Sequence, residues 1–140
     1  MNHKRFVRIS ALVLAFVLVL GVAAMGITAM AASGDTLYFK PSANWKEAGA
    51  RFAAYFWDGN GKETWADATD ADGDGYYEVK LPEGYPNIIF CRMNPGAPAN
   101  NWNNKWNQSG DLKVPTNGTN LYTVKAGTWD KGGGTWSTKQ

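Results

Sequence analysis

The chain has 140 residues, of which 14 are Lys or Arg, 12 are Asp or Glu, and one, His3, is His. Such a balanced charge gives no basic surface for nucleic acid. The one His lies at the extreme N-terminus, so the rest of the chain lacks the residue that Ser–His catalysis, Cys–His catalysis and a His-ligated metal require. The single cysteine, Cys91, excludes an intrachain disulfide, and its apolar surroundings predict a small buried side chain.

The N-terminal segment has the order of a secretory signal. Three basic residues precede a nearly all-apolar stretch over residues 9–22, and Ala29-Met30-Ala31 supplies the small residues of a cleavage site. We therefore expect residues 1–31 to be a cleavable N-terminal signal helix. The alternative is a retained membrane anchor, because the apolar residues continue to Ala32. Cleavage would leave a secreted domain, residues 32–140, with 11 basic and 12 acidic side chains and no membrane attachment.

The remaining chain is a series of short apolar or alternating runs separated by turns rich in Gly, Pro, Asn and Asp. No ten-residue segment shows convincing helical periodicity, although residues 45–53 could hold one helical turn. This spacing predicts a single all-β sandwich domain. The expected strands cover residues 37–39, 51–57, 63–68, 76–81, 88–93, 111–114 and 121–125. Residues 128–137, which contain three glycines in a row, should form a final hairpin or the end of a strand.

Residues 51–57 alternate with a period of two, which predicts a strand with two different faces. Phe52, Ala54 and Phe56 would face the core, whereas Tyr55 and Trp57 would form a half-exposed aromatic platform. The turn at 58–61 returns the chain as a strand that carries Trp65, so we expect the rings of Tyr55 and Trp65 to pair across the hairpin. Trp45, Trp129 and Trp136 are expected to pack at the ends of the sandwich.

The stretch from Asn87 to Gln108 begins with a strand that is apolar on both faces, which predicts a central position. After Asn94-Pro95-Gly96 the composition changes to Asn mixed with Trp102 and Trp106. Asn competes for backbone hydrogen bonds and favours loops. A loop of amides and indoles suits a neutral polyhydroxylated ligand such as a sugar. Alternatively, the two Trp side chains simply cap one end of the core.

Residues 70–75, D-A-D-G-D-G, match the first half of an EF-hand loop. The twelfth position of that loop is Leu81 instead of Glu, and no helical pattern flanks it. We therefore expect an Asp/Gly hairpin turn and not a calcium site at Asp70, Asp72 and Asp74, and no other cofactor.

The order of short motifs resembles a family 26 starch-binding module and its relative, family 25. These motifs are L-Y-F-K-P, N-W, A-A-Y-F-W-D-G, T-W, D-G-D-G-Y-Y-E-V, I-I-F and W-N-Q-S-G-D-L, and they run from Leu37 to Leu112 within a likeness that reaches about Trp136. The resemblance implies an immunoglobulin-like antiparallel β-sandwich of the kind appended to secreted bacterial amylases. It also implies that Tyr55, Trp65 and Gln108 bind α-1,4-glucan. Residues 91–105 depart from the family by intervening between I-I-F and N-Q-S, which implies an enlarged binding face.

These observations predict a secreted, monomeric, non-catalytic carbohydrate-binding module for starch. The expected site residues are Tyr55, Trp57, Trp65, Trp102, Trp106 and Gln108. One alternative is an extracellular protein-interaction or adhesion domain whose aromatic residues meet a protein. A glycosidase with an Asp/Glu pair is disfavoured because the domain is small and its carboxylates cluster in turns.

Overall fold

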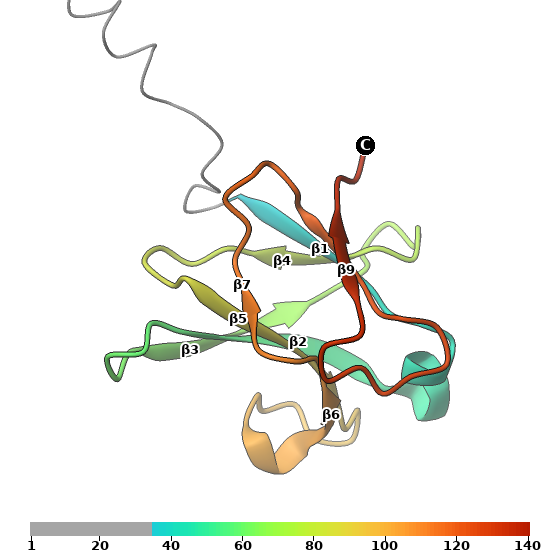
Figure 1. The fold of residues 1–140 in the computed structure, drawn as a ribbon. Coiled ribbons are helices and arrows are strands. Elements are labelled where there is room, and N and C mark those ends of the chain that lie inside the picture. The colour runs from blue at the N-terminus through green and yellow to red at the C-terminus, as the bar shows by residue number, and fades with distance from the viewer. Residues whose placement is uncertain (1–34) are drawn as a thin grey trace, which may run out of the picture. The chain divides into compact units, whose positions relative to one another are not determined.

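The computed structural model describes residues 35–140, which form two β-sheets and little helix (Figure 1). This arrangement confirms the predicted all-β, sandwich-like architecture. The predicted signal peptide, residues 1–31, lies outside the described residues. Among residues 35–140 no helix has the length and apolar character needed to cross a bilayer.

The four-stranded sheet has the order β4-β1-β8-β9. Its strands are β1 (Thr36–Lys40), β4 (Tyr77–Lys80), β8 (Leu121–Thr123) and β9 (Thr135–Ser137). The prediction of a wholly antiparallel sandwich is wrong at one pair, because β1 and β8 are parallel. Of the two forms expected for the C-terminal segment, the structure has the single strand and not the hairpin, since only Thr135–Ser137 is a strand and it pairs with β8.

The five-stranded sheet has the order β3-β2-β5-β6, and β7 pairs with the start of β5. Its strands are β2 (Arg51–Trp57), β3 (Glu63–Ala68), β5 (Asn87–Met93), β6 (Lys105–Gln108) and β7 (Leu112–Lys113). Two short 3-10 helices complete the fold, η1 (Asn44–Gly49) and η2 (Trp102–Asn104). The predicted bounds of β2 and β3 are confirmed, because their alternation and the turn between them leave little choice of register.

An aromatic core lies between the two sheets. Phe39 of β1 stacks on Phe90 of β5 with ring centroids 4.7 Å apart. Trp45 of η1 is fully buried and its Nε1 donates to the Thr128 carbonyl at 3.0 Å. Trp136 packs half-buried against this core, so the predicted roles of Trp45 and Trp136 are confirmed.

Strand β5 is buried along its whole length, as its composition predicts. Ile88 and Phe90 join the core between the sheets, whereas Ile89, Cys91 and Met93 form a second apolar cluster with Ala53. This second cluster lies on the opposite side of the five-stranded sheet, which we call the outer face. Burial raises the pKa of the Cys91 thiol to about 12, so Cys91 acts as a small apolar side chain.

The Asn- and Trp-rich segment was expected to be a loop throughout, and its second half is instead η2 and β6. Strand β6 forms because β5 otherwise leaves one edge unpaired, and a buried strand must satisfy its backbone groups. Cys91 lies opposite Gln108 and Arg92 opposite Asn107, with a β-bulge next to Met93. The chain before β6 lies on the side of the sheet away from β1 and β4 (Figure 1, orange).

Candidate functional site

The register of β2 and β3 creates an aromatic pair on the outer face. Tyr55 lies directly opposite Trp65, and residues in opposite positions share one face of a sheet. Their ring centroids are 5.1 Å apart and the planes are tilted by 56°. Trp57 stacks on Tyr55 with centroids 5.5 Å apart and an interplanar angle of 22°. The structure therefore brings together three of the predicted site residues, and all three side chains are half-buried.

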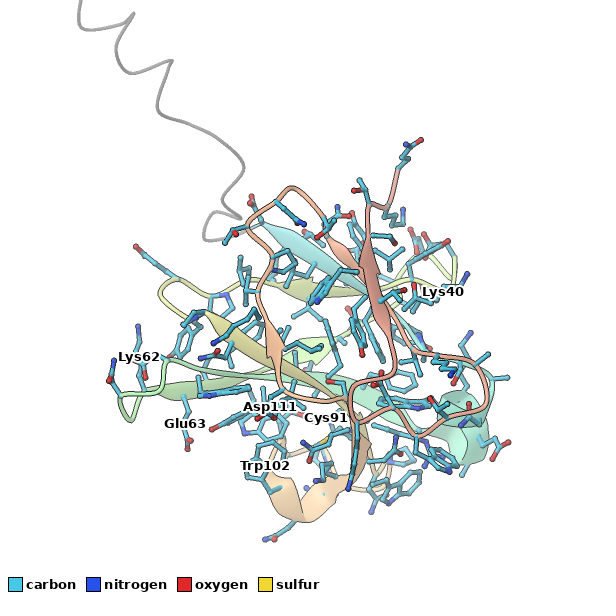
Figure 2. All side chains as sticks on the ribbon, in the orientation of Figure 1. Lys40, Lys62, Glu63, Cys91, Trp102 and Asp111 are labelled. Atoms are coloured by element: carbon cyan, nitrogen blue, oxygen red, sulfur yellow. The ribbon has the colours of Figure 1, made fainter. Side chains whose placement is uncertain are left out.

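Trp102 joins this group from η2. Its ring meets Tyr55 edge-on at 4.7 Å between centroids and Trp65 at 4.8 Å, and 42% of its surface remains exposed. Figure 2 shows Trp102 between its loop and the sheet, with Glu63 to one side. We call Tyr55, Trp57, Trp65 and Trp102 the outer-face cluster. Trp102 adds a wall to the pair, so the cluster is not a flat platform.

Arg51 at the start of β2 holds the loop that carries Trp102. Its Nε donates to the carbonyls of Asn94 and Ala97 at 3.3 and 3.0 Å, and its Nη2 donates to the Ala99 carbonyl at 2.7 Å. Its Nη1 donates to Asn100 Oδ1 at 2.5 Å. A side chain of β2, the strand next to β5 in the same sheet, therefore holds the 94–101 loop in position.

The amides of this loop mainly fold the loop itself. Asn100 Nδ2 donates to Asp67 Oδ1 at 2.8 Å, and Asn101 Oδ1 accepts from the Asn104 backbone N–H at 2.9 Å. Asn104 Nδ2 donates to the Ala99 carbonyl at 2.9 Å. Each of these three side chains thus makes at least one hydrogen bond within the protein, and a role of the loop amides as ligand donors stays a prediction.

Gln108 remains on the outer face, opposite Cys91. Its Oε1 accepts a hydrogen bond from Lys105 Nζ, and that ammonium lies 5.2 Å from the Trp102 ring centroid. Within the described part of the chain the Gln108 Nε2 has no hydrogen-bond partner, so it can donate to a ligand. Lys105 and Gln108 therefore place polar hydrogens on the same face as the aromatic rings.

Tyr55 is fixed by a strong hydrogen bond. Its hydroxyl donates to Glu63 Oε2 at 2.5 Å. This bond, together with burial and the negative charge of Glu63, raises the pKa of Tyr55 to about 12. The phenol thus stays protonated, and its ring is held in place beside Trp65.

Trp106, although a predicted site residue, does not belong to the outer-face cluster. Its ring centroid lies 4.6 Å from the Arg92 guanidinium carbon, and Trp129 lies 5.3 Å from the same atom. Trp129, which was expected to pack at a sandwich end, contacts Arg92 there but remains 49% exposed. Sequence alone offered no signal for this grouping, because Trp106 and Trp129 come from distant strands and loops.

The acidic turn is the one place among residues 35–140 where three potential metal-ligating side chains gather. Carboxylate oxygens of Asp70, Asp72 and Asp74 lie within 4.8 Å of one another. These carboxylates also accept hydrogen bonds from the backbone N–H groups of Asp74, Gly75 and Tyr76. The turn itself accounts for their arrangement, as expected for Asp in tight turns.

No protein-family model, curated protein or solved structure matches the chain.

Proposed function

We propose that this protein is a secreted, non-catalytic carbohydrate-binding module for starch and related α-1,4-glucans, of the immunoglobulin-like family 26 type. The observation that carries the proposal is the tilted pair of Tyr55 and Trp65 with Trp102 standing edge-on to both rings. Glucose presents apolar C–H faces to such rings and hydroxyls to the side chains around them. Tilted rings follow a curved chain such as amylose better than a straight one such as cellulose.

The polar groups beside the cluster suit the hydroxyls of a sugar. The Glu63 carboxylate is exposed and accepts hydrogen bonds, whereas Gln108 Nε2 and Lys105 Nζ donate them. Each ring would contribute about 0.5–1.5 kcal/mol beyond area burial, by analogy with aromatic pairs. Each hydrogen bond would add roughly 1 kcal/mol net. A shallow site of this kind should bind with Kd on the order of 10–100 µM.

The carboxylates of the outer face support a role in binding and not in hydrolysis. Glu63 and Asp67 are four residues apart on β3, which separates them by roughly 13 Å along an extended strand. Glycosidase carboxylates are about 5–9.5 Å apart. Both side chains are also engaged, Glu63 with Tyr55 and Asp67 with Asn100.

The test is calorimetry of the wild-type protein and of Trp65→Ala against maltoheptaose, with a cello-oligosaccharide of similar length as the ligand control. We expect wild-type binding to maltoheptaose only, and a loss of at least tenfold in outer-face affinity in Trp65→Ala. Tyr76→Ala is a matched control, because Tyr76 is a half-exposed ring near Lys40 and Lys139 and outside the cluster. Absence of any binding by folded wild-type protein would refute the proposal.

A second candidate function is an extracellular protein-interaction or adhesion domain. It is favoured by the exposure of Trp102, Trp106 and Trp129, since tryptophan is enriched at the centres of protein interfaces. This candidate predicts a change of hydrodynamic size on mixing with a protein partner and no response to oligosaccharides.

A further inference from the structure

We propose that Trp106 and Trp129 form a second α-glucan-binding site, separate from the outer-face cluster. The inference rests on the proposed function and adds a second surface of the same ligand class. Both rings lie within 5.3 Å of the guanidinium carbon of Arg92, although the two tryptophans are on β6 and in the loop between β8 and β9. One short oligosaccharide can therefore reach both rings. We call this group the Arg92 surface.

Arg92 makes the surface rigid. Its side chain is buried, with 8% exposure for the residue, and its Nε donates to the Trp45 carbonyl at 2.7 Å. Its Nη2 donates to the Glu47 carbonyl at 2.6 Å. The guanidinium therefore cannot swing away, and it fixes the rings by cation–π contact. Rings that are already ordered lose little conformational entropy when a ligand binds.

The loop that carries Trp129 is anchored on both sides of that residue. The Thr128 carbonyl accepts hydrogen bonds from Asn44 Nδ2 at 2.8 Å and from Trp45 Nε1 at 3.0 Å. On the other side, the Lys131 N–H donates to the Gln108 carbonyl at 3.2 Å. The loop is thus fixed on both sides of Trp129, and it holds the indole at the surface with 49% of the residue exposed.

The two surfaces are on different sides of β5. Cys91 lies opposite Gln108 on the outer face, and Arg92, the next residue, points to the other side of the strand. Arg92 reaches η1, whereas the outer-face cluster is built on β2, β3 and η2. Occupation of one surface therefore leaves the other open.

The chemistry of the Arg92 surface favours a neutral ligand. The guanidinium is buried and bonded to backbone carbonyls, so it offers little to an anion. What remains accessible is indole, with 42% of Trp106 and 49% of Trp129 exposed. With Trp102, these are the large apolar side chains most exposed to solvent in residues 35–140. Such rings suit the C–H faces of glucose units.

Two weak sites on one domain have a consequence for polymeric ligands. A long glucan or a granule can engage both surfaces, and the second contact then forms at a high effective concentration. Retention on granular starch should therefore exceed what either surface gives alone. A short oligosaccharide should bind the two surfaces independently.

The first test is NMR of the tryptophan indole N–H groups during titration of the whole protein with maltoheptaose. The chain has seven tryptophans, and single Trp→Phe variants assign their signals. We expect the Trp65 and Trp102 signals to shift along one isotherm and the Trp106 and Trp129 signals along a second. Because the wild-type protein is titrated, the result does not depend on the folding of a variant.

The second test compares wild type with Trp106→Ala/Trp129→Ala and with Tyr76→Ala. We expect the double variant to fall from two calorimetric sites to one and to lose about tenfold or more in retention on granular starch. Tyr76→Ala should behave as wild type.

The outcomes separate the two proposals. If only Trp65 and Trp102 respond to the sugar, the Arg92 surface is not a glucan site, whether or not it contacts a protein, and the proposed function stands. If only Trp106 and Trp129 respond, the second site stands and the assignment of the outer-face cluster is wrong. If no indole responds, both proposals are overturned.

Discussion

The outer-face cluster and the Arg92 surface both present tryptophan to solvent, but they hold it by different means. In the cluster, the sheet register sets Tyr55 against Trp65, and Arg51 ties the loop of Trp102 to the sheet. In the Arg92 surface, one buried guanidinium joins rings that are 23 positions apart in the chain. Loss of Arg51 should therefore weaken the first surface without unfolding the sheet beneath it, whereas loss of Arg92 should affect both the second surface and the fold around it.

The substitution with the largest expected effect on stability is Arg92→Ala. Removing the guanidinium leaves the carbonyls of Trp45 and Glu47 without their charged donors and removes both cation–π contacts. We expect the free energy of unfolding to fall by about 3 kcal/mol, since a hydrogen bond to a charged group contributes about 1.5–3 kcal/mol. Urea unfolding followed by tryptophan fluorescence measures this change.

Trp106→Ala is the control for Arg92→Ala, because it removes one ring and keeps the carbonyl bonds. Trp106→Ala should lower the free energy of unfolding by only about 1 kcal/mol. Equal stabilities of the two variants would mean that the buried hydrogen bonds of Arg92 do not hold this end of the sandwich.

A smaller effect is expected for Arg51→Ala. This change releases the carbonyls of the 94–101 loop, where water can replace the lost donors because Ala99 is exposed. Trp102 should then lose its fixed position over Tyr55 and Trp65, and outer-face affinity for maltoheptaose should fall about threefold to tenfold, or roughly 0.7–1.4 kcal/mol. Calorimetry measures the affinity.

The indole N–H signals of the same Arg51→Ala variant report on the two surfaces separately. Trp106 and Trp129 should respond to the sugar as in wild type, while the Trp102 signal moves even without ligand. Arg51→Lys should restore little, because an ammonium lacks the several fixed donors of a guanidinium. Unchanged affinity in Arg51→Ala would show that the loop needs no anchor.

The smallest effect concerns the hydrogen bond between Tyr55 and Glu63. The pKa of Tyr55 is raised to about 12 from its ordinary value of 10.0, so the folded state keeps the phenol proton more firmly than the unfolded chain does. This contribution to stability is fully present below pH 10.0 and is lost as the pH rises towards about 12. Tyr55→Phe should therefore lose less stability than wild type across this interval.

Urea midpoints of both proteins at pH 9, 10, 11 and 12 measure this difference. Other groups titrate alike in the two proteins, so their effect on stability cancels in the comparison. Tyr55→Phe keeps the aromatic ring, so it should still bind maltoheptaose at pH 7. Parallel loss of stability in the two proteins would mean that the Glu63 bond does not stabilise the folded state.

The outer-face cluster was largely predictable because it depends on local pattern. Alternation over residues 51–57 and a short turn place Tyr55 and Trp65 on one face of a hairpin. The burial of β5 is predicted by its apolar residues on both faces. The contact of Trp102 with this pair was not predictable, since it depends on how Arg51 folds a loop over the sheet. Strand β6 was missed because its Asn- and Trp-rich composition hides the pairing with β5.

The sequence by itself determined most of the strands, β6 excepted, and showed that the chain has more aromatic side chains than a small core needs, because a two-residue period and turn residues act over short distances. Only the tertiary structure decided how those tryptophans divide. Trp102 and Trp106 are close in sequence, yet Trp102 packs against Trp65 and Trp106 packs against Arg92. That division follows from contacts between distant segments, above all the reach of Arg51 to the 94–101 loop and of Arg92 to η1.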